Sequence, residues 1–241
     1  MMYKLPRFKK IKALIHAIST KKDGNMSVNW GKKSEVIQNR LRFLKRLEIK
    51  SENCTGLQLE HKNKIIEIQK KHVGRGILNT DAPVGDCLIT NKKNIYLFLL
   101  TGDCLPITFY DTKKKMLALA HLGWKNTDSE FCKNIVNKFS KEGSDPKNII
   151  VYIGPGIHKK SYIKNKDIPN WGKFIKKLDK TNYQIDLIDY NVQQLLDCGI
   201  LKKNIEIDKN DTGKSTKYFS HYQSKKTNKK EGRFATIAGM Q

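Results

Sequence analysis

Two segments near the middle of the chain carry residue types that could bind a metal ion or act as nucleophile and base. TGDCLPITFYD contains Cys104 and LALAHLGWKN contains His121, with a turn-like DTKKK between them. Apolar runs on both sides of a turn predict an antiparallel hairpin. If residues 111–114 form the turn, Cys104 lies directly opposite His121, with Cβ atoms about 5 Å apart. A shift of one residue in this pairing would place the two side chains on opposite faces.

A thiol and an imidazole at this spacing suit two kinds of chemistry. They can act as nucleophile and general base, or they can share a metal ion. A catalytic zinc usually has three protein ligands and an open fourth position, so a third ligand must come from elsewhere in the chain. Spacing alone does not select it among the histidines and acids that remain, which are His16, His61, His72, His158, His221, Asp81, Asp86 and Asp103.

The elements that must position these residues are predicted from hydrophobic periodicity, capping residues and turn residues. We expect helices at 34–47 with Ser34 as N-cap, from the N-cap residues 126–128 to about Lys141, and at 191–198. We expect strands at 65–69, 95–101, 105–110, 116–121, 149–154 and 234–238. Pro106 predicts a sheet edge or a bulge beside Cys104.

The order of these elements predicts the fold class. Strands and helices alternate without a regular βαβ repeat, which favours an α/β fold of the mixed α+β sandwich kind. We expect a largely mixed or antiparallel sheet flanked by helices, with residues 1–241 as a single domain.

Composition excludes some classes of protein. The chain has 241 residues and a net charge of +24, which attracts phosphates and RNA, but its lysines are scattered over the whole sequence. We therefore interpret most of them as solvated surface. The longest apolar runs are too short for a membrane-spanning segment. Five cysteines without a CxxC pair predict reduced thiols in the cytoplasm, with Cys54 in an exposed loop and the core positions Cys87, Cys132 and Cys198.

Several motifs occur together in a specific order. GDCLPI is followed by HLGW, and the flanking pieces are ISTKKDGNMSVNWG, VIQNR, LEHKNKI, TDAPVGDCLITN, IGPGI, YFS and GR. This series resembles the laccase-domain family over nearly the whole chain. Members of that family have been described as multicopper polyphenol oxidoreductases and as zinc-dependent purine nucleoside phosphorylases with adenosine deaminase activity.

The resemblance implies a zinc ion bound by His61, Cys104 and His121. It implies phosphorolysis of adenosine, inosine, guanosine or methylthioadenosine, together with deamination of adenosine by a zinc-activated water. Asp103 would then orient that water or a ligand. Copper fits less well, because the chain lacks the many histidines that several copper ions need. The partners implied are purine nucleosides and inorganic phosphate. No membrane partner is expected, and nucleic acid is expected only through the net positive charge.

Four residues are candidates for binding phosphate or the nucleoside. Lys125 follows HLGW at the predicted helix N-terminus, where free N–H groups favour an anion, and Arg40 and Arg233 are further candidates for phosphate. Trp124 could stack on a purine or ribose. The alternative for the basic residues is solvated surface, and the alternative for Trp124 is core packing.

The sequence also departs from the family pattern. Leu59, Glu60 and Lys62 replace the usual residues around the first histidine, Lys125 replaces an arginine, and the late Cys-Thr element and the arginines after Phe-Ser are missing. Lysine lacks the bidentate fork that grips phosphate. Two other functions therefore stay open. One is a metal-independent hydrolase with Cys104 as nucleophile and His121 as base, and the other is a non-catalytic, basic RNA- or partner-binding protein with a degenerate site.

Overall fold

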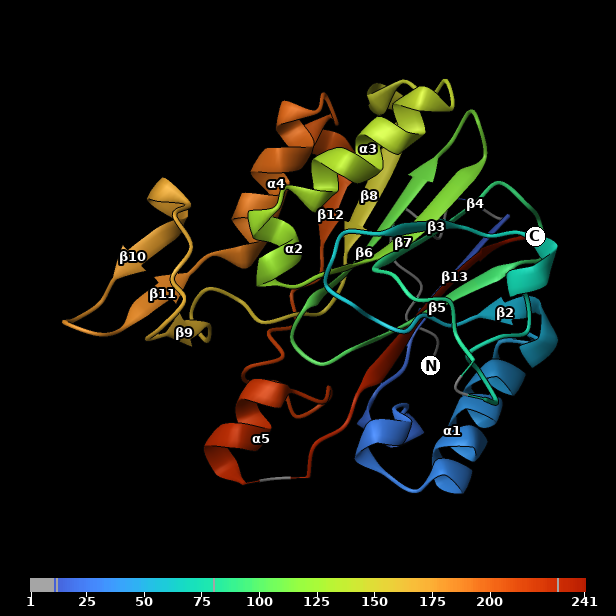
Figure 1. The fold of residues 1–241 in the computed structure, drawn as a ribbon, viewed down its shortest axis with the longest axis horizontal. Coiled ribbons are helices and arrows are strands. Elements are labelled where there is room, and N and C mark those ends of the chain that lie inside the picture. Colours follow the sequence, from blue (N-terminus) through green and yellow to red (C-terminus); the bar gives the residue numbers. More distant parts are fainter. Residues whose placement is uncertain (1–10, 12, 80, 229) are drawn as a thin grey trace.

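Two β-sheets form the centre of the protein, which the computed structural model describes for residues 11, 13–79, 81–228 and 230–241 (Figure 1). The larger sheet has the strand order β12-β8-β6-β7-β4-β3. Its strands are β3 (Ile65–Glu67), β4 (Cys87–Thr90), β6 (Leu105–Asp111), β7 (Met116–Leu122), β8 (Ile149–Ile153) and β12 (Ile205–Ile207). The smaller sheet, ordered β1-β13-β5-β2, consists of β1 (Leu14–Ile18), β2 (Cys54–Thr55), β5 (Tyr96–Thr101) and β13 (Phe234–Met240).

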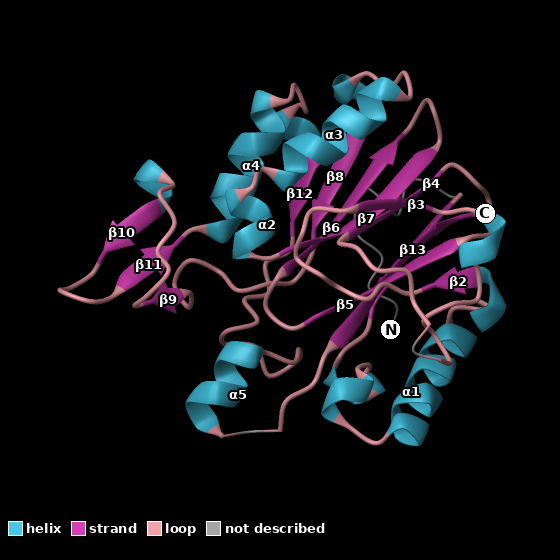
Figure 2. Cartoon of the chain, in the orientation of Figure 1, coloured by secondary structure: helices cyan, strands magenta, loops and turns pink. Residues whose placement is uncertain are grey.

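Helices cover the outer faces of both sheets (Figure 2). The described α-helices are α1 (Lys33–Arg46), α2 (Trp124–Asp128), α3 (Phe131–Lys141), α4 (Leu187–Asp197) and α5 (His221–Thr227). Short 3₁₀ turns lie at Lys21–Asp23, Val28–Trp30, Ser51–Asn53, Lys70–His72, Pro146–Asn148, Gly172–Phe174 and Lys202–Asn204. α1 lies on the smaller sheet, and α3 and α4 lie on the larger one. The predicted mixed α/β fold with flanking helices is confirmed.

The alternation of side chains along the strands explains this layering, because successive residues of a strand point to opposite faces. Leu97 of β5 and Leu119 of β7 belong to one apolar cluster between the two sheets. Phe98, the next residue of β5, points the other way and packs with Phe43 of α1. Ala118, beside Leu119, belongs to the cluster beneath α3 and α4. Both faces of the two sheets are therefore buried, which agrees with their almost uniformly apolar sequences.

The hairpin of β6 and β7 forms as predicted, but its register differs by two residues. The ladder pairs Leu105 with Leu122 and Pro106 with His121, so continuing it places Cys104 opposite Gly123. The predicted direct pairing of Cys104 with His121 is therefore wrong. The reason is that the turn comes after Asp111, whose carboxylate accepts hydrogen bonds from the two backbone amides that follow it by two and three residues. A shift of two residues keeps the face, so the thiol and the imidazole remain diagonal neighbours.

The predicted edge or bulge at Pro106 is also wrong, because β6 lies between β7 and β8. The proline is tolerated because the pairing of β6 with β8 begins one residue later, at Ile107 opposite Ile153. Its carbonyl oxygen accepts a hydrogen bond from the backbone N–H of Gly154 at 2.9 Å, and the missing N–H leaves this pair at the end of the strand with one hydrogen bond.

Three predicted helices have different ends in the structure. α1 has Lys32 rather than Ser34 as its N-cap residue. The single helix expected from 126–128 to Lys141 is two helices, because Glu130 adopts a left-handed conformation with φ 54° and separates α2 from α3. α4 begins four residues earlier than expected, since Asp186 caps it by accepting a hydrogen bond from the backbone N–H of Asp189.

A third, small sheet projects from the body beside the larger sheet (Figure 1). It has the order β10-β11-β9 and consists of β9 (Ile163–Lys164), β10 (Ile175–Lys177) and β11 (Tyr183–Ile185). No strand was expected in this lysine-rich stretch, because its strands are short and its apolar residues do not alternate over more than a few positions.

The cysteines are all free, and their burial agrees only partly with the prediction. Cys87 and Cys132 are buried in the core, whereas Cys198 is half-buried. The expectation of an exposed thiol at Cys54 is wrong, because this residue begins β2 and packs in the cluster beneath α1. Among the described residues, no helix combines the length and the apolar character that crossing a membrane requires.

Candidate metal centre and cavity

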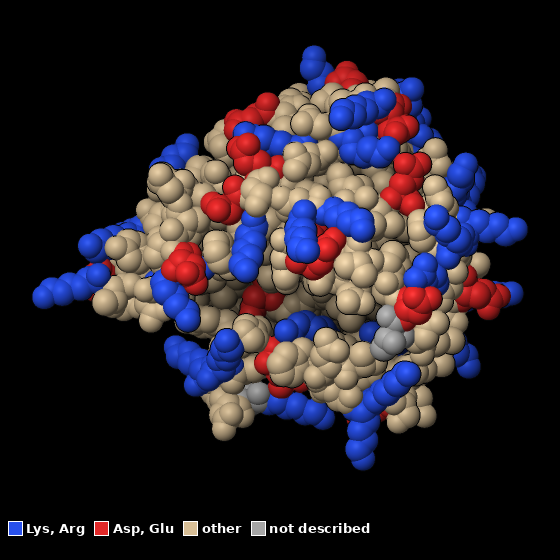
Figure 3. Space-filling model, in the orientation of Figure 1, with Lys and Arg blue, Asp and Glu red and all other residues tan. Residues whose placement is uncertain are grey.

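A cavity of about 770 Å³ opens where β6 begins and β7 ends. Its walls include all three predicted metal ligands, His61, Cys104 and His121, together with Trp124 and Arg233. Figure 3 shows one face of the molecule with a hollow near its centre. Lysine and arginine side chains are spread over that whole face rather than gathered in one patch. The structure therefore brings these five residues to one cavity, although they come from distant parts of the chain.

The loop that carries His61 is folded around a buried carboxylate. Asp86, which has no exposed surface, accepts hydrogen bonds from the backbone N–H groups of His61, Lys62 and Asn63 at 2.8, 2.7 and 2.9 Å. His61 and Asn63 both adopt left-handed conformations, with φ of 59° and 62°, which turn these N–H groups toward one point. The backbone oxygen of Asp86 accepts a hydrogen bond from the N–H of His121. One residue thus fixes both the loop and the strand.

This arrangement brings the two imidazoles together. The ring centroids of His61 and His121 lie 5.0 Å apart. Ligand atoms of His61, Asp86 and His121 all lie within 4.8 Å of one another, a spacing at which one ion could be bound. The metal-spaced cluster therefore contains Asp86, which the sequence offered only as one of several third ligands. Cys104 lines the same cavity but is not part of this cluster.

Gly123 explains how the thiol approaches the imidazole. A Cβ atom at this position would lie 3.0 Å from Sγ of Cys104 and 3.4 Å from Cε1 of His121. The strand end therefore needs a residue without a side chain, so that the thiol can occupy the space beside the ring.

Burial controls the protonation of both groups. It lowers the pKa of His121 to about 3, with a further contribution from nearby His61, so the imidazole is neutral at physiological pH. Burial, assisted by the negative charge of Asp103, raises the pKa of the Cys104 thiol to about 12. Nδ1 of His121 is buried and, among the described residues, has no hydrogen-bond partner. A neutral imidazole with an unpartnered nitrogen is suited to bind a cation, which would also stabilise a thiolate beside it.

Asp103 has structural partners on both carboxylate oxygens. Oδ1 accepts a hydrogen bond from the Thr212 hydroxyl at 2.7 Å, and Oδ2 accepts one from the backbone N–H of Tyr222 at 2.7 Å. Burial raises its pKa, although these hydrogen bonds act in the opposite direction. The carboxylate thus fastens the first turn of α5 to the cavity wall, a contact that the sequence did not suggest.

The four residues predicted to bind phosphate or nucleoside separate into two groups. Trp124 and Arg233 line the cavity. Lys125 is exposed on α2 and is not part of the lining, and α2 has only five residues, so little helix dipole supports a phosphate there. The Arg40 guanidinium is buried and donates to the carbonyl oxygens of Met26, Gly76 and Ile77, which gives it a structural role beside a second cavity.

That second cavity has a volume of about 600 Å³ and adjoins the first one. The two share His61, Leu59, Leu100 and Arg233. Trp30 lies on the wall of the second cavity, where the Arg233 guanidinium is 5.2 Å from its ring. Arg233 therefore stands at the junction of the two spaces.

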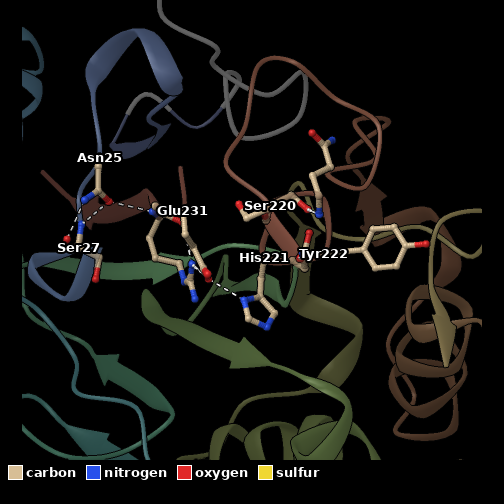
Figure 4. Close-up of polar contacts among 11 residues, drawn as sticks. Asn25, Ser27, Ser220, His221, Tyr222 and Glu231 are labelled. Carbon is tan, nitrogen blue, oxygen red and sulfur yellow. Dashed lines mark hydrogen bonds and ion pairs between the residues drawn. The ribbon is translucent and has the colours of Figure 1, made fainter. Parts of the chain in front are cut away.

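A network of ion pairs orients Arg233 (Figure 4). Glu231 accepts a hydrogen bond from Nη1 of Arg233 at 2.8 Å and contacts Nδ1 of His221 at 2.6 Å through the same oxygen, Oε1. Burial tends to raise the pKa of Glu231, but the hydrogen bonds of His221 and Arg233 outweigh it, so the pKa is lowered. The side chain of Asn25 accepts a hydrogen bond from the backbone N–H of Arg233. Sequence analysis missed Glu231, whose only signal is its place in the EGR tripeptide.

Comparisons with known proteins identify relatives over most of the chain. Residues 17–241 match the family model described as "Multi-copper polyphenol oxidoreductase laccase". A protein of Bacillus subtilis (strain 168) named "Purine nucleoside phosphorylase YlmD" is 27% identical over 87% of this chain and 78% of its own length. "Purine nucleoside phosphorylase SACOL1200" of Staphylococcus aureus (strain COL) is 30% identical over 86% of this chain and 80% of its own length.

Solved structures show the same fold. Hypothetical protein YfiH of Bacillus licheniformis superposes with a TM-score of 0.89 at 24% identity, over 97% of this chain and 95% of that one. YlmD from Geobacillus stearothermophilus superposes with a TM-score of 0.88 at 24% identity, over 98% of this chain and 94% of that one.

Proposed function

This chain belongs to the multi-copper polyphenol oxidoreductase laccase family, and from that premise we propose that it is a zinc-dependent purine nucleoside phosphorylase. The names of the two relatives support the reaction class. The observation that carries the proposal is the pair of facing imidazoles, His61 and His121, at the wall of a cavity that also holds an indole and a guanidinium. The proposed substrates are adenosine, inosine, guanosine or methylthioadenosine, with inorganic phosphate.

The donor set suits zinc. His61, His121 and the thiolate of Cys104 would hold the ion, and Asp86 would hold the loop that presents His61. The unpartnered Nδ1 of His121 and the neutral state of its ring support this fit. Bound zinc would supply Lewis acidity to a phosphate or water oxygen in the cavity.

The remaining residues of the cavity have complementary tasks. Trp124, Tyr162, Ile157 and Leu187 form an apolar wall against which a purine ring can pack, with Lys164 over one face of the indole. Arg233 offers a planar fork of N–H donors to a phosphate, and its ion pair with Glu231 restricts the orientation of that fork. Phosphate at Arg233 and a purine at Trp124 would place the ribose between them, beside the two imidazoles.

We also propose that the site deaminates adenosine, since a water molecule held beside the imidazoles could reach C6 of a stacked purine. The five free cysteines support the predicted location in the cytoplasm, where thiols stay reduced.

Two structural observations weigh against the alternatives. A Cys104 thiol whose pKa is raised to about 12 is a poor nucleophile without a cation, which disfavours the metal-independent hydrolase. On the face shown in Figure 3, lysine and arginine side chains are spread out and form no single basic groove for RNA.

The test combines metal analysis with an assay of base release. We expect about one zinc per chain and release of hypoxanthine from inosine that requires inorganic phosphate. Adenosine should yield adenine with phosphate and inosine without it. A folded protein that binds no zinc, and releases no base from any of the four nucleosides with phosphate, would contradict the proposal.

A further inference from the structure

A lysine from the projecting sheet reaches back to the wall of the cavity. Lys164 is the last residue of β9, and its Nζ lies 3.8 Å from the centroid of the Trp124 ring. Its side chain lines the cavity together with Tyr162, whereas the nearby Lys166 is exposed and does not. The projecting sheet thus contributes one cation to the aromatic wall.

The charges around Lys164 leave its ammonium group available. Burial is the main cause that lowers its pKa, the positive charges of Lys125 and Lys166 lower it further, and Asp167 and Asp128 act in the opposite direction. Within the described part of the chain, Lys164 takes part in no ion pair, and its Nζ lies over the ring of Trp124. The N–H groups that do not face the indole are therefore free to donate to a ligand.

Several other polar groups of the cavity have partners within the protein. Both oxygens of Asp103 accept hydrogen bonds from the protein, and His221 is paired with Glu231. Arg233 lies at the junction of the two cavities and is held by the same glutamate. Of the groups beside Trp124, Lys164 is the donor closest to the indole face.

Phosphorolysis of a purine nucleoside is accelerated by a proton donor near the departing base. When the bond between C1′ and N9 breaks, its electron pair stays with the purine, and N7 is the ring atom that can take up a proton at the same time. Protonating a leaving group in the transition state typically accelerates a reaction by about 10²–10⁴-fold.

We propose that Lys164 is a catalytic residue that protonates N7 of the departing purine; this rests on the proposed function. As the C1′–N9 bond breaks, a proton moves from Nζ to N7, and an oxygen of hydrogen phosphate forms the new bond to C1′. The proton that hydrogen phosphate gives up returns to the amine through solvent. The products are the neutral base and ribose 1-phosphate, and Lys164 ends in its starting state.

The experiment compares Lys164→Met with the matched control Lys166→Met on two substrates, inosine and 7-methylinosine. The methylated base already carries a positive charge and leaves without protonation at N7. In Lys164→Met we expect kcat for inosine to fall by about 100-fold or more, with KM changed only a few-fold. For 7-methylinosine, kcat should stay within about three-fold of wild type, and Lys166→Met should match wild type on both substrates.

Two results would overturn the inference. One is an unchanged kcat, or a loss confined to KM, with inosine in Lys164→Met; the other is an equal loss of kcat on the two substrates. Thermal unfolding of both variants checks that the fold is intact. If the wild-type protein releases no base from any nucleoside, the proposed function itself fails, so the two failures are distinguishable.

Discussion

The two buried histidines of the inter-sheet layer have the same protonation state and different surroundings. Burial lowers the pKa of both His16 and His121 to about 3. His16 lies in the part of the layer away from the cavity, which we call the closed region. There Nε2 of His16 is 3.0 Å from the Thr108 hydroxyl, and its ring packs edge-on against Tyr152. At the end of the layer that borders the cavity, which we call the open end, His121 faces the imidazole of His61. Its buried Nδ1 has no partner among the described residues. Burial alone therefore does not mark a site; what distinguishes His121 is the adjacent cavity and the second imidazole that faces it.

The largest expected effect separates the two histidines directly. His121→Ala removes a proposed ligand at the open end, so zinc binding should be lost and phosphorolysis should fall by about 1,000-fold or more. His16→Gln serves as the matched control and should keep about one zinc per chain and near wild-type turnover. Metal analysis and the phosphate-dependent release of hypoxanthine measure both. Equal losses in the two variants would remove the distinction between the two regions.

A smaller effect is expected at the residue that joins the loop to the strand. Asp86→Asn places an amide N–H₂ where backbone N–H groups now donate, which weakens the fold of the 61–63 loop. We expect zinc affinity to fall by about 10- to 100-fold, as is typical when a residue supporting a ligand is changed. Asp81→Asn, at an exposed carboxylate paired with Arg75, is the control and should leave the affinity unchanged. Zinc titration against a competing chelator measures both, and equal affinity in wild type and Asp86→Asn would disprove the positioning role.

The closed region should respond in stability rather than in activity. Thr108→Val removes the hydroxyl beside Nε2 of His16 and leaves that nitrogen buried without this partner. The free energy of unfolding should fall by about 1–3 kcal/mol, while zinc content stays at wild-type level. Denaturant unfolding followed by metal analysis tests this, and a loss of zinc without a loss of stability would contradict it.

The smallest effect concerns pH. His16 has a pKa of about 3 in the folded protein and about 6.5 when unfolded, so below pH 6.5 the unfolded chain binds a proton that the folded chain does not. The stability present above pH 6.5 is therefore lost as the pH falls toward 3, by at most about 1.4 kcal/mol per pH unit from this group. His16→Gln should lower the slope of unfolding free energy against pH between 6.5 and 5 by about that amount. An unchanged slope would show that His16 is protonated in the folded protein.

Sequence patterns sufficed for the parts of the fold and site that depend on local periodicity. The β6–β7 hairpin, its buried faces and the convergence of Cys104 with His121 follow from two apolar runs and one turn. The register was wrong by two residues because the position of the turn depends on how Asp111 accepts backbone hydrogen bonds, which the residue types alone do not fix. Cys104 and His121 still lie on the same face of the hairpin, because a shift of two residues does not change the face to which a side chain points.

Contacts between residues that are far apart in the sequence could not be predicted from local sequence patterns. Lys164 is one of many lysines, and only the folding of a small third sheet places it on Trp124. The exposed position expected for Cys54 was wrong because a two-residue strand leaves no periodic signal. Asp86 was among the candidates, but its grip on three consecutive amides depends on left-handed residues that no motif in the sequence indicated.

The hydrogen bonds from the 61–63 loop to Asp86 also bear on the unusual residues around His61 in the LEHKNKI motif. The carboxylate contacts main-chain amides, and those amides are present whatever side chains the loop carries. The side chains of Glu60 and Lys62 beside His61 therefore take no part in the three hydrogen bonds that hold the loop to Asp86. A sequence that departs from the usual motif around its first histidine can therefore still hold the imidazole in place through one buried carboxylate.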